Sequence, residues 1–244
     1  MSRTRLSNFT WIELERVARD ARLGIIPVGA IEPYGPHLPV STDGIVAEWI
    51  ALQVAERCGG VVTPLVFVGN SALFSDFPGT MTIDDVVLYQ ILAGVAQGLH
   101  SAGFTELLVI NGHAGNSSVI NRYLTHEAVQ LFHRVLQIDV WRLAESLGQD
   151  LFAGIIGAFT HAGPCATAVM LVIAPDLVRK EALQTAEQVT PIWLPGTYLP
   201  ILFRKLYPKA YAGDIQRANP EAGKLLLERI VNYVVKAIQK ADVH

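Results

Sequence analysis

The segment that decides the fold is LGIIPVGAIEPYGPHLPVSTD, which spans residues 23–43. Its first seven residues, 23–29, form an uninterrupted apolar run with the length of a buried strand. The remainder is a loop rich in proline and glycine that carries Glu32, Tyr34, His37 and Asp43. Parallel α/β sheets place their functional loops after the carboxyl ends of such strands. The segment therefore predicts an α/β protein with a site at this edge of its sheet.

The rest of the chain repeats the alternation of apolar strands with helices. Further strands are predicted at 61–68, where Pro64 interrupts the apolar run, and at 105–110 and 135–140. Helices are predicted at 10–22, 43–58, 82–103, 116–132, 162–173, after Asp176, and at 220–240. Short strands alternating with helices indicate βαβ units and a parallel sheet covered on both faces.

Composition excludes several classes of protein. Of the 244 residues, 51% are hydrophobic and 17% are charged, below an average charged fraction of about 25%, which excludes a disordered chain and a coiled coil. The net charge of -3 provides no basic surface for nucleic acid. No apolar run reaches the roughly 18 residues of a membrane span. We therefore expect no nucleic-acid or membrane partner, and expect the apolar excess in a two-sided sheet or a subunit interface.

The organisation of the chain predicts a single domain over 1–244. It contains no internal repeat, low-complexity tract or convincing linker. Residues 191–213 are dense in proline and aromatics and are interpreted as an irregular excursion, either a lid or an oligomer contact. The two cysteines, Cys58 and Cys165, provide no disulfide framework, and the N-terminal segment lacks an apolar signal core. A cytoplasmic location is expected.

Three loops at strand ends or helix starts carry side chains suited to chemistry: 29–43, 111–116 and 160–167. Glu32, Asp43 and His113 are expected to converge at one edge of the sheet. Two carboxylates and one imidazole make a site for a divalent ion such as Zn, Mn or Fe(II), with positions left for water or substrate. The alternative is structural: Asp43 caps a helix, Glu32 bonds its loop, and His113 holds a turn.

These loops resemble the creatininase (creatinine amidohydrolase) family. The likeness is carried by GAIEPYGPHLPVSTD at 29–43, NGHAGN at 111–116 and HAG at 161–163, with Thr167, Met170 and Leu171 following. Supporting segments are GNS at 69–71, FPGT at 77–80, GD at 213–214 and ANPEAG at 218–223. They occur over most of the chain in the family's order.

The resemblance implies a three-layer α/β/α sandwich with a mostly parallel central sheet. It also implies metal-dependent hydrolysis of amide bonds in small molecules and a homo-oligomer, frequently a hexamer. Family activities include ring opening of creatinine, deformylation of a formylaminopyrimidine nucleotide, and peptide trimming. Asp43 matches the family aspartate that bridges two metals, while Glu32 and His113 match the first metal's other ligands.

The ligands of the family's second metal are missing. Tyr34 stands in place of a histidine, Ala166 in place of a glutamate, and Gly115 in place of an acidic residue that some members carry. Because affinity depends on the number of anionic ligands, we expect one divalent ion (Zn, Mn or Fe) rather than two. Leu73 and Phe74 replace polar pocket residues, which favours a more neutral or apolar small-molecule substrate than creatinine.

The function predicted from these features is mononuclear metal-dependent hydrolysis of a non-peptide C–N bond in a small molecule. His161 is assigned as the proton shuttle to the leaving amine, and Tyr34, Ser71 and Cys165 as substrate-binding residues. Two alternatives remain open. One is a metal-assisted isomerase, cyclase or lyase on the same scaffold, and the other is a catalytically silent homologue that binds a small molecule.

Several of these side chains also allow other interpretations. Tyr34 is either a phenolate ligand or a neutral phenol that fills the lost histidine's space. His37 is either a substitute ligand or a brace for its loop. Cys165 lies close to His161 in sequence, so a thiol nucleophile with His161 as its base is the alternative to a buried cysteine that fills space.

Overall fold

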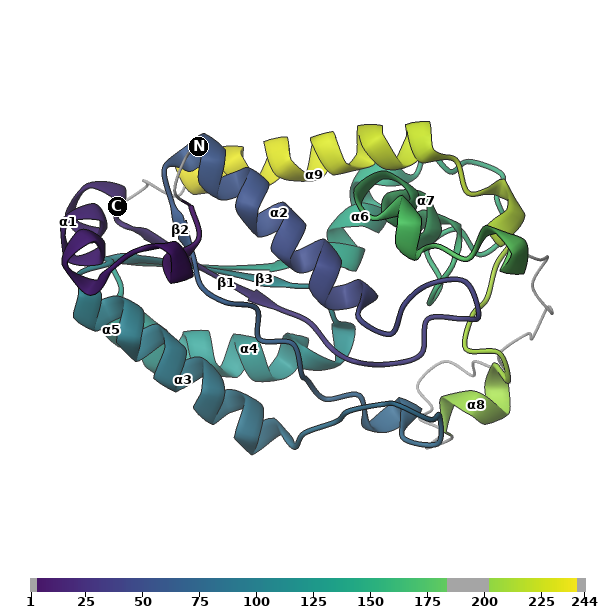
Figure 1. The fold of residues 1–244 in the computed structure, drawn as a ribbon, viewed down its shortest axis with the longest axis horizontal. Helices are drawn as coiled ribbons and strands as arrows, with labels where there is room; N and C mark the ends of the chain where they lie inside the picture. The colour runs from purple at the N-terminus through teal and green to yellow at the C-terminus, as the bar shows by residue number, and fades with distance from the viewer. Residues whose placement is uncertain (1–3, 184–201, 241–244) are drawn as a thin grey trace.

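The computed structural model describes residues 4–183 and 202–240. Within these ranges, a four-stranded parallel sheet has the order β2-β1-β3-β4 (Figure 1). Its strands are β1 (Leu23–Val28), β2 (Val61–Val62), β3 (Glu106–Asn111) and β4 (Arg134–Asp139). The apolar run at 23–29 thus becomes an inner strand, wholly buried along its length.

Both faces of the sheet are buried, because successive side chains of a strand point to opposite faces. In β3, Leu108 and Ile110 belong to one apolar core, while Leu107 and Val109 belong to the other. This two-sided burial absorbs much of the chain's apolar content. It also explains why the inner strands are continuous apolar runs rather than alternating ones.

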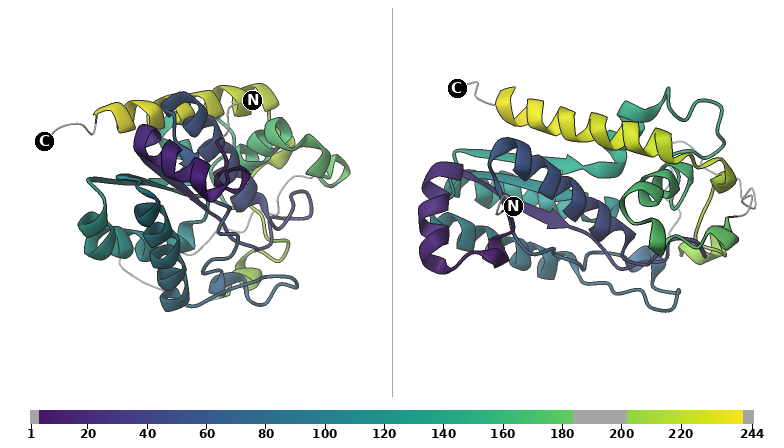
Figure 2. Two further views of the ribbon diagram at one scale, coloured as in Figure 1. Left: turned by 60° about the vertical axis from the view of Figure 1, so that its left-hand side comes forward. Right: turned by 45° about the horizontal axis from the view of Figure 1, so that its top comes forward.

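Helices cover each face, which confirms the three-layer α/β/α fold with a parallel central sheet. Figures 1 and 2 show α2 and α9 on one side of the strands and α3 and α4 on the other. The first core is completed by α2 (Thr42–Cys58), α6 (Val140–Gly148), α7 (Pro164–Ile173) and α9 (Pro220–Lys240). The second is completed by α1 (Trp11–Ala21), α3 (Asp85–Ala102), α4 (Ser117–Tyr123) and the turns that follow α4.

Local signals account for the helix ends. Thr10 and Glu13 form the capping box expected before α1, with each side chain bonded to the other's backbone N–H. Pro220 occupies the first position of α9, and the Asn219 side chain accepts a hydrogen bond from the Glu221 N–H at 2.9 Å. The helix expected from Thr82 begins at Asp85, because Asp84 is its N-cap and keeps an extended backbone.

The strand predicted at 61–68 is wrong beyond Val62. Pro64 has no N–H to donate, so the regular ladder with β1 stops there. The chain nevertheless continues beside β1, since the Val66 N–H donates to the Pro27 carbonyl at 3.0 Å and Val66 forms an isolated bridge with Val28. The second strand is therefore a short edge strand followed by an extended segment.

Other helix predictions also needed correction. After Asp176 the described chain forms two 3₁₀ turns, Pro175–Leu177 and Lys180–Ala182, because the intervening Arg179 donates its N–H to the His37 carbonyl at 2.9 Å. The helix predicted over 116–132 contains a π-helical stretch, Leu124–Ala128, before α5 (Val129–Leu131). Helix α6 (Val140–Gly148) was not expected from the sequence, because its first residue, Val140, continues the apolar run of the strand predicted at 135–140.

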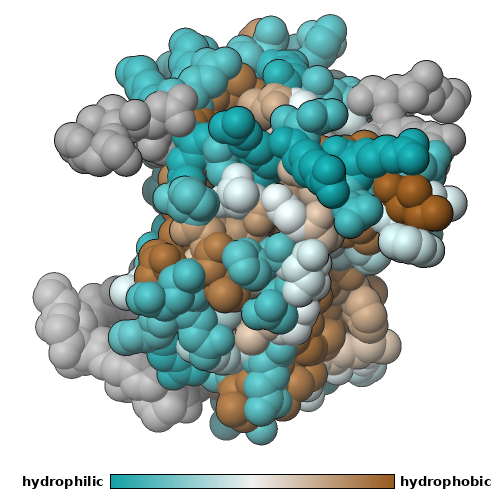
Figure 3. All heavy atoms as spheres, turned by 90° about the vertical axis from the view of Figure 1, so that its left-hand side faces the viewer, coloured by the Kyte–Doolittle hydropathy of each residue, from teal (hydrophilic) through white to brown (hydrophobic). Residues whose placement is uncertain are grey.

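Part of the apolar content remains on the surface. Figure 3 shows hydrophobic side chains interspersed with hydrophilic ones at one end of the molecule. Trp11 is 76% exposed, and Leu225 and Tyr233 of α9 are about half exposed. A homo-oligomer stays a prediction.

The irregular excursion expected at 191–213 lies only partly within the described ranges. Residues 191–201 lie outside them, and α8 (Phe203–Leu206) follows. No described helix combines the length and apolar character that crossing a membrane requires.

The packing of α9 against α7 gives the first testable prediction. A Cβ at Gly223 would lie 2.3 Å from the Ala168 carbonyl oxygen, whereas a Cβ at Gly94 in α3 meets no atom within 4 Å. Gly223→Ala is expected to lower the free energy of unfolding by about 1–3 kcal/mol, because the two helix backbones must separate. Gly94→Ala is expected to raise it by up to about 1 kcal/mol, because alanine is the better helix former. Urea denaturation measures both, and equal effects of the two substitutions would contradict this packing.

Candidate metal centre

Three side chains converge at the carboxyl end of the sheet. Glu32 lies in the loop after β1, Asp43 in the first turn of α2, and His113 directly after β3. Each offers one ligand atom, and these atoms lie within 4.8 Å of one another. The three residues are 1%, 0% and 6% exposed. The structure therefore brings together the three predicted ligands in one buried cluster.

Backbone contact between two loops places Asp43 beside His113. Gly112 precedes His113, and its N–H donates to the Val28 carbonyl at the end of β1 at 2.8 Å. A Cβ at Gly112 would lie 2.2 Å from the Asp43 carbonyl oxygen. Only glycine permits this approach, so the residue before the histidine allows β3 and the start of α2 to meet.

The separations within the cluster fit a bound divalent ion. His113 Nδ1 lies 3.1 Å from Asp43 Oδ2 and 3.2 Å from Glu32 Oε2. Ligand atoms that share an ion at about 2.1 Å are separated by about 3.0–3.4 Å in tetrahedral or octahedral geometry. Two buried carboxylates also need a nearby cation to offset their desolvation. Both the geometry and the charge of the donor set fit one Zn, Mn or Fe(II) ion.

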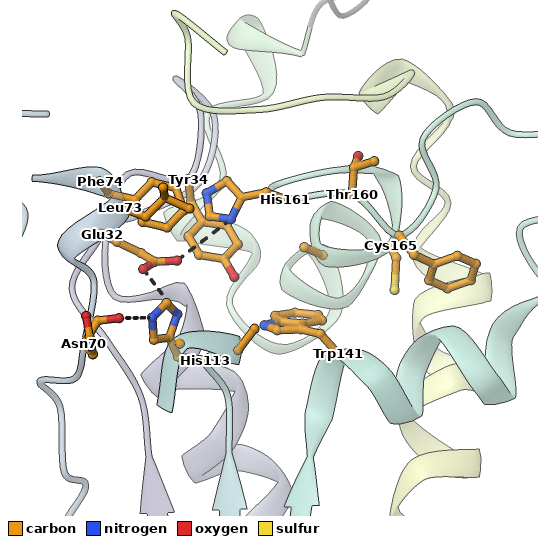
Figure 4. A pocket seen from close by; sticks show the side chains of 14 residues that line it. Glu32, Tyr34, Asn70, Leu73, Phe74, His113, Trp141, Thr160, His161 and Cys165 are labelled. Carbon is orange, nitrogen blue, oxygen red and sulfur yellow. Dashed lines mark hydrogen bonds and ion pairs between the residues drawn. The ribbon is translucent and has the colours of Figure 1, made fainter. Parts of the chain in front are cut away.

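The orientation of the His113 ring supports the same fit. Its Nε2 donates to the Asn70 carbonyl at 2.8 Å, which directs Nδ1 toward the two carboxylates (Figure 4). Burial by itself lowers the pKa of His113, but hydrogen bonds to Asp43 and Glu32 and their charges outweigh it and raise this pKa to about 11. Without a metal the cluster thus holds a proton at Nδ1, where a metal-bound chain would hold the cation.

Each carboxylate is held by further hydrogen bonds. The Ser71 hydroxyl donates to Glu32 Oε2 at 2.7 Å. The second oxygen of Asp43, Oδ1, accepts hydrogen bonds from the Tyr34 hydroxyl and, at 2.9 Å, from Trp141 Nε1. Burial, with the charges of Asp43 and Glu32, raises the pKa of Tyr34 well above its ordinary value. Tyr34 is therefore a neutral hydrogen-bond donor.

His161 lies above Glu32 and faces the pocket. Its Nε2 donates to the Pro33 carbonyl at 2.7 Å, and its Nδ1 lies 3.8 Å from Glu32 Oε1 (Figure 4). The ring is enclosed by aromatic neighbours: its centroid lies 4.5 Å from that of Tyr34, 4.7 Å from Phe74 and 5.0 Å from Phe203. The backbone bond and these rings fix the imidazole with one nitrogen available on the metal-facing side.

A cavity of about 280 Å³ opens over the cluster. Glu32, His113, His161 and Tyr34 line it, as predicted for a site, and so does Cys165. Ser71 lies instead behind Glu32, buried and bonded to it. Burial raises the pKa of the Cys165 thiol to about 12, which disfavours the alternative of a thiolate nucleophile at neutral pH.

The residues missed by the sequence reasoning are Asn70 and Trp141, which orient His113 and Asp43. Trp141 is the second residue of α6, immediately beyond the end of β4. Parallel sheets carry functional side chains beyond the carboxyl ends of their strands, so the end of the fourth strand also indicates a site residue. Asn70 acts through its carbonyl, so its side-chain type carried no signal.

His37 does not join the cluster. It is fully buried, and its Nε2 donates at 2.9 Å to the Thr167 hydroxyl, which itself donates to the Gly163 carbonyl. Among the described residues His37 Nδ1 has no hydrogen-bond partner. Burial lowers the pKa of His37 to about 4. The residue thus braces its loop against α7, which is the structural alternative considered for it.

The lowered pKa of His37 predicts a loss of stability in mild acid. As pH falls below about 6.5, the unfolded chain binds a proton at this residue that the folded chain excludes until about pH 4, so unfolding is favoured. Between pH 6.5 and 5 this costs about 2 kcal/mol, at about 1.36 kcal/mol per unit. In urea denaturation, His37→Gln should flatten the pH dependence by that amount. An unchanged slope in His37→Gln would show that other groups cause the acid sensitivity.

Comparison with known proteins agrees with this arrangement. The family description "Creatininase: Creatinine amidohydrolase" matches residues 7–238. The creatinine amidohydrolase of Pseudomonas putida is 28% identical over 252 residues, covering 96% of each chain. The mycofactocin precursor peptide peptidase of Mycolicibacterium smegmatis is 32% identical over 166 residues, covering 65% of this chain and 61% of its own. A mutant creatininase of the Zn-Zn type superposes with a TM-score of 0.85 at 27% identity, covering all of both chains. The chain belongs to the creatininase family.

Proposed function

We propose that this protein is an amidohydrolase that cleaves a non-peptide C–N bond in a small molecule with the help of one divalent ion. Family membership and the Glu32, Asp43 and His113 cluster support metal-dependent hydrolysis. The observation that carries the one-metal proposal is that the two carboxylate oxygens of Asp43 have different partners. Its Oδ2 faces His113, while its Oδ1 accepts hydrogen bonds from Tyr34 and Trp141.

An aspartate that bridges two ions by giving one oxygen to each needs both oxygens available. Here two donors from different elements occupy Oδ1, and one of them, Tyr34, stands where the family has a histidine ligand. Ala166 and Gly115, at the positions of acidic ligands in the family, line the cavity without offering a ligand atom. The second ion therefore lacks both its bridge and its own ligands, and the single site is retained.

Within this proposal Glu32, Asp43 and His113 hold the ion. When bound, a divalent ion supplies Lewis-acid chemistry, polarising an amide carbonyl and lowering the pKa of the attacking water. Ser71 and Asn70 keep Glu32 and His113 in position through their hydrogen bonds. Tyr34 and Trp141 do the same for Asp43. Ligand orientation of this kind is worth about 10–100-fold in metal affinity or activity.

His161 is the group proposed to move protons. Its Nε2–H is committed to the Pro33 carbonyl, so Nδ1, near Glu32 at the cavity, is the atom that takes up and delivers a proton. An imidazole can both accept and donate a proton, which suits delivery to a leaving amine. The rings of Tyr34, Phe74 and Phe203 hold it in place and shield it from water.

The one-metal proposal predicts the metal content of the purified chain. Elemental analysis after loading with Zn is expected to give about one equivalent per chain. Asp43→Asn should weaken binding by at least about 100-fold, because it removes one of the two anionic ligands. The control is Asp150→Asn, which removes an exposed carboxylate paired with Arg229 and should leave the metal content unchanged.

A double variant tests why only one metal ion is expected per chain. Tyr34→His with Ala166→Glu restores a ligand at each altered position and removes one of the two donors to Asp43 Oδ1, so it should bind about two equivalents. Tyr34→Phe removes the same donor but adds no ligand, and it should remain at one. Two equivalents in the unaltered chain would refute the one-metal proposal, and none with Zn, Mn or Fe(II) would refute metal dependence.

The reaction and the role of His161 are tested together. The loaded chain is incubated with a panel of small neutral amides, and products are followed by mass spectrometry, where hydrolysis adds the mass of one water and a rearrangement adds none. With an amide that is hydrolysed, His161→Gln should lower kcat by about 10²–10⁴-fold at unchanged metal content. Products of unchanged mass would overturn hydrolysis. A full kcat in His161→Gln would remove the proton-transfer role from this residue.

A further inference from the structure

The cavity above the metal centre combines a few polar groups with a largely apolar lining. Its acidic and imidazole groups, Glu32, His113 and His161, gather on one side in Figure 4. Leu73 and Phe74 lie beside them, and Trp141 and Cys165 lie across the cavity in the same view. With Phe159 and Ala166 these side chains form an apolar wall around the metal-facing groups. A substrate whose amide reaches the ion must place its remaining atoms against this wall.

One of these side chains is open to solvent. Leu73 is 48% exposed, whereas the neighbouring Phe74 is 6% exposed. An exposed leucine that lines a cavity offers apolar surface for a ligand to cover. The volume of about 280 Å³ corresponds to about nine waters at about 30 Å³ each. A group on the scale of one ring fits this volume.

The described lining of the cavity contains no Lys or Arg to pair with an anionic group. The stretch 184–201, QTAEQVTPIWLPGTYLPI, contains neither residue in its sequence. Arg204, close in sequence to Phe203, donates to the Asp76 carbonyl at 2.8 Å and stacks over the Phe77 ring. A carboxylate or phosphate in the apolar part would lose its hydration without gaining a counter-ion.

Charge balance at the metal centre points the same way. The two carboxylates offset the charge of one divalent ion, which leaves no net positive charge to attract an anion. We propose that the substrate is a neutral small amide carrying one compact apolar or aromatic group that packs on Leu73, Phe74 and Trp141, and that substrates bearing a carboxylate or phosphate on that group are excluded. This inference rests on the proposed one-metal amidohydrolase function, because the ion positions the amide.

Three hydroxamates test the inference on the Zn-loaded full chain by calorimetric titration. Acetohydroxamate has the metal-binding group alone, benzohydroxamate adds a phenyl ring, and 4-carboxybenzohydroxamate adds a charge to that ring. Benzohydroxamate is expected to bind at least about tenfold more tightly than acetohydroxamate, because its ring leaves water for the apolar wall. The carboxylated probe is expected to bind at least about tenfold more weakly than benzohydroxamate.

A matched pair of variants tests whether the cavity causes this order of hydroxamate affinities. Leu73→Lys places a cation at the mouth and should bring the affinity of 4-carboxybenzohydroxamate to that of benzohydroxamate or above it. Leu225→Lys changes a leucine of almost equal exposure, 49%, on α9 and should leave the order of affinities unchanged. Both positions are half exposed, so both should accept lysine without loss of folding.

The outcomes separate the two proposals. If acetohydroxamate binds but the phenyl ring adds no affinity, or if the carboxylated probe binds more tightly than benzohydroxamate, the substrate class is overturned and the metal centre stands. If none of the three binds the Zn-loaded chain, the proposed function is overturned and the inference falls with it. A Leu73→Lys variant that keeps the original order of affinities removes Leu73 from the recognition of the substrate.

Discussion

The site depends on one electrostatic constraint, which is that two buried carboxylates share a single imidazole. Glu32 and Asp43 are both removed from water, and His113 Nδ1 lies within 3.2 Å of an oxygen of each. Buried charges of one sign are tolerated only when a cation lies between or beside them. A proton on His113 or a divalent ion meets that requirement. The surrounding loops are arranged so that either can be held at the same place.

The layers of hydrogen bonds around the cluster follow from this constraint. The atoms of His113 and Asp43 that face away from the centre are each hydrogen-bonded to other residues. The Asn70 carbonyl accepts a hydrogen bond from His113 Nε2. Tyr34 and Trp141 both donate to Asp43 Oδ1, the oxygen that faces away from His113. These contacts set the ligand orientations. In the proposed one-metal site they also engage the oxygen of Asp43 that a second ion would need.

The architecture was predictable wherever local patterns agree with burial. The apolar runs at 23–28 and 106–111 are strands because two-sided burial leaves no room for polar alternation. The predicted length of β2 was wrong for a local reason, because its ladder with β1 stops just before Pro64. The helix predicted after Asp176 was wrong because a contact distant in sequence intervenes, the hydrogen bond from Arg179 to the His37 carbonyl. Helix α6 was missed because its first residue continues the apolar pattern of β4.

The sequence by itself determined the fold class, the family and the residue types at the centre, because strand periodicity and the loop motifs at 29–43 and 111–116 are local in the chain. Through the resemblance it also predicted which family ligands are absent. Only the tertiary structure decided how the remaining groups are used. Trp141 reaches Asp43 across 98 positions, and Ser71 reaches Glu32 across 39. Such pairings depend on how strands and helices pack, and no local pattern encodes them.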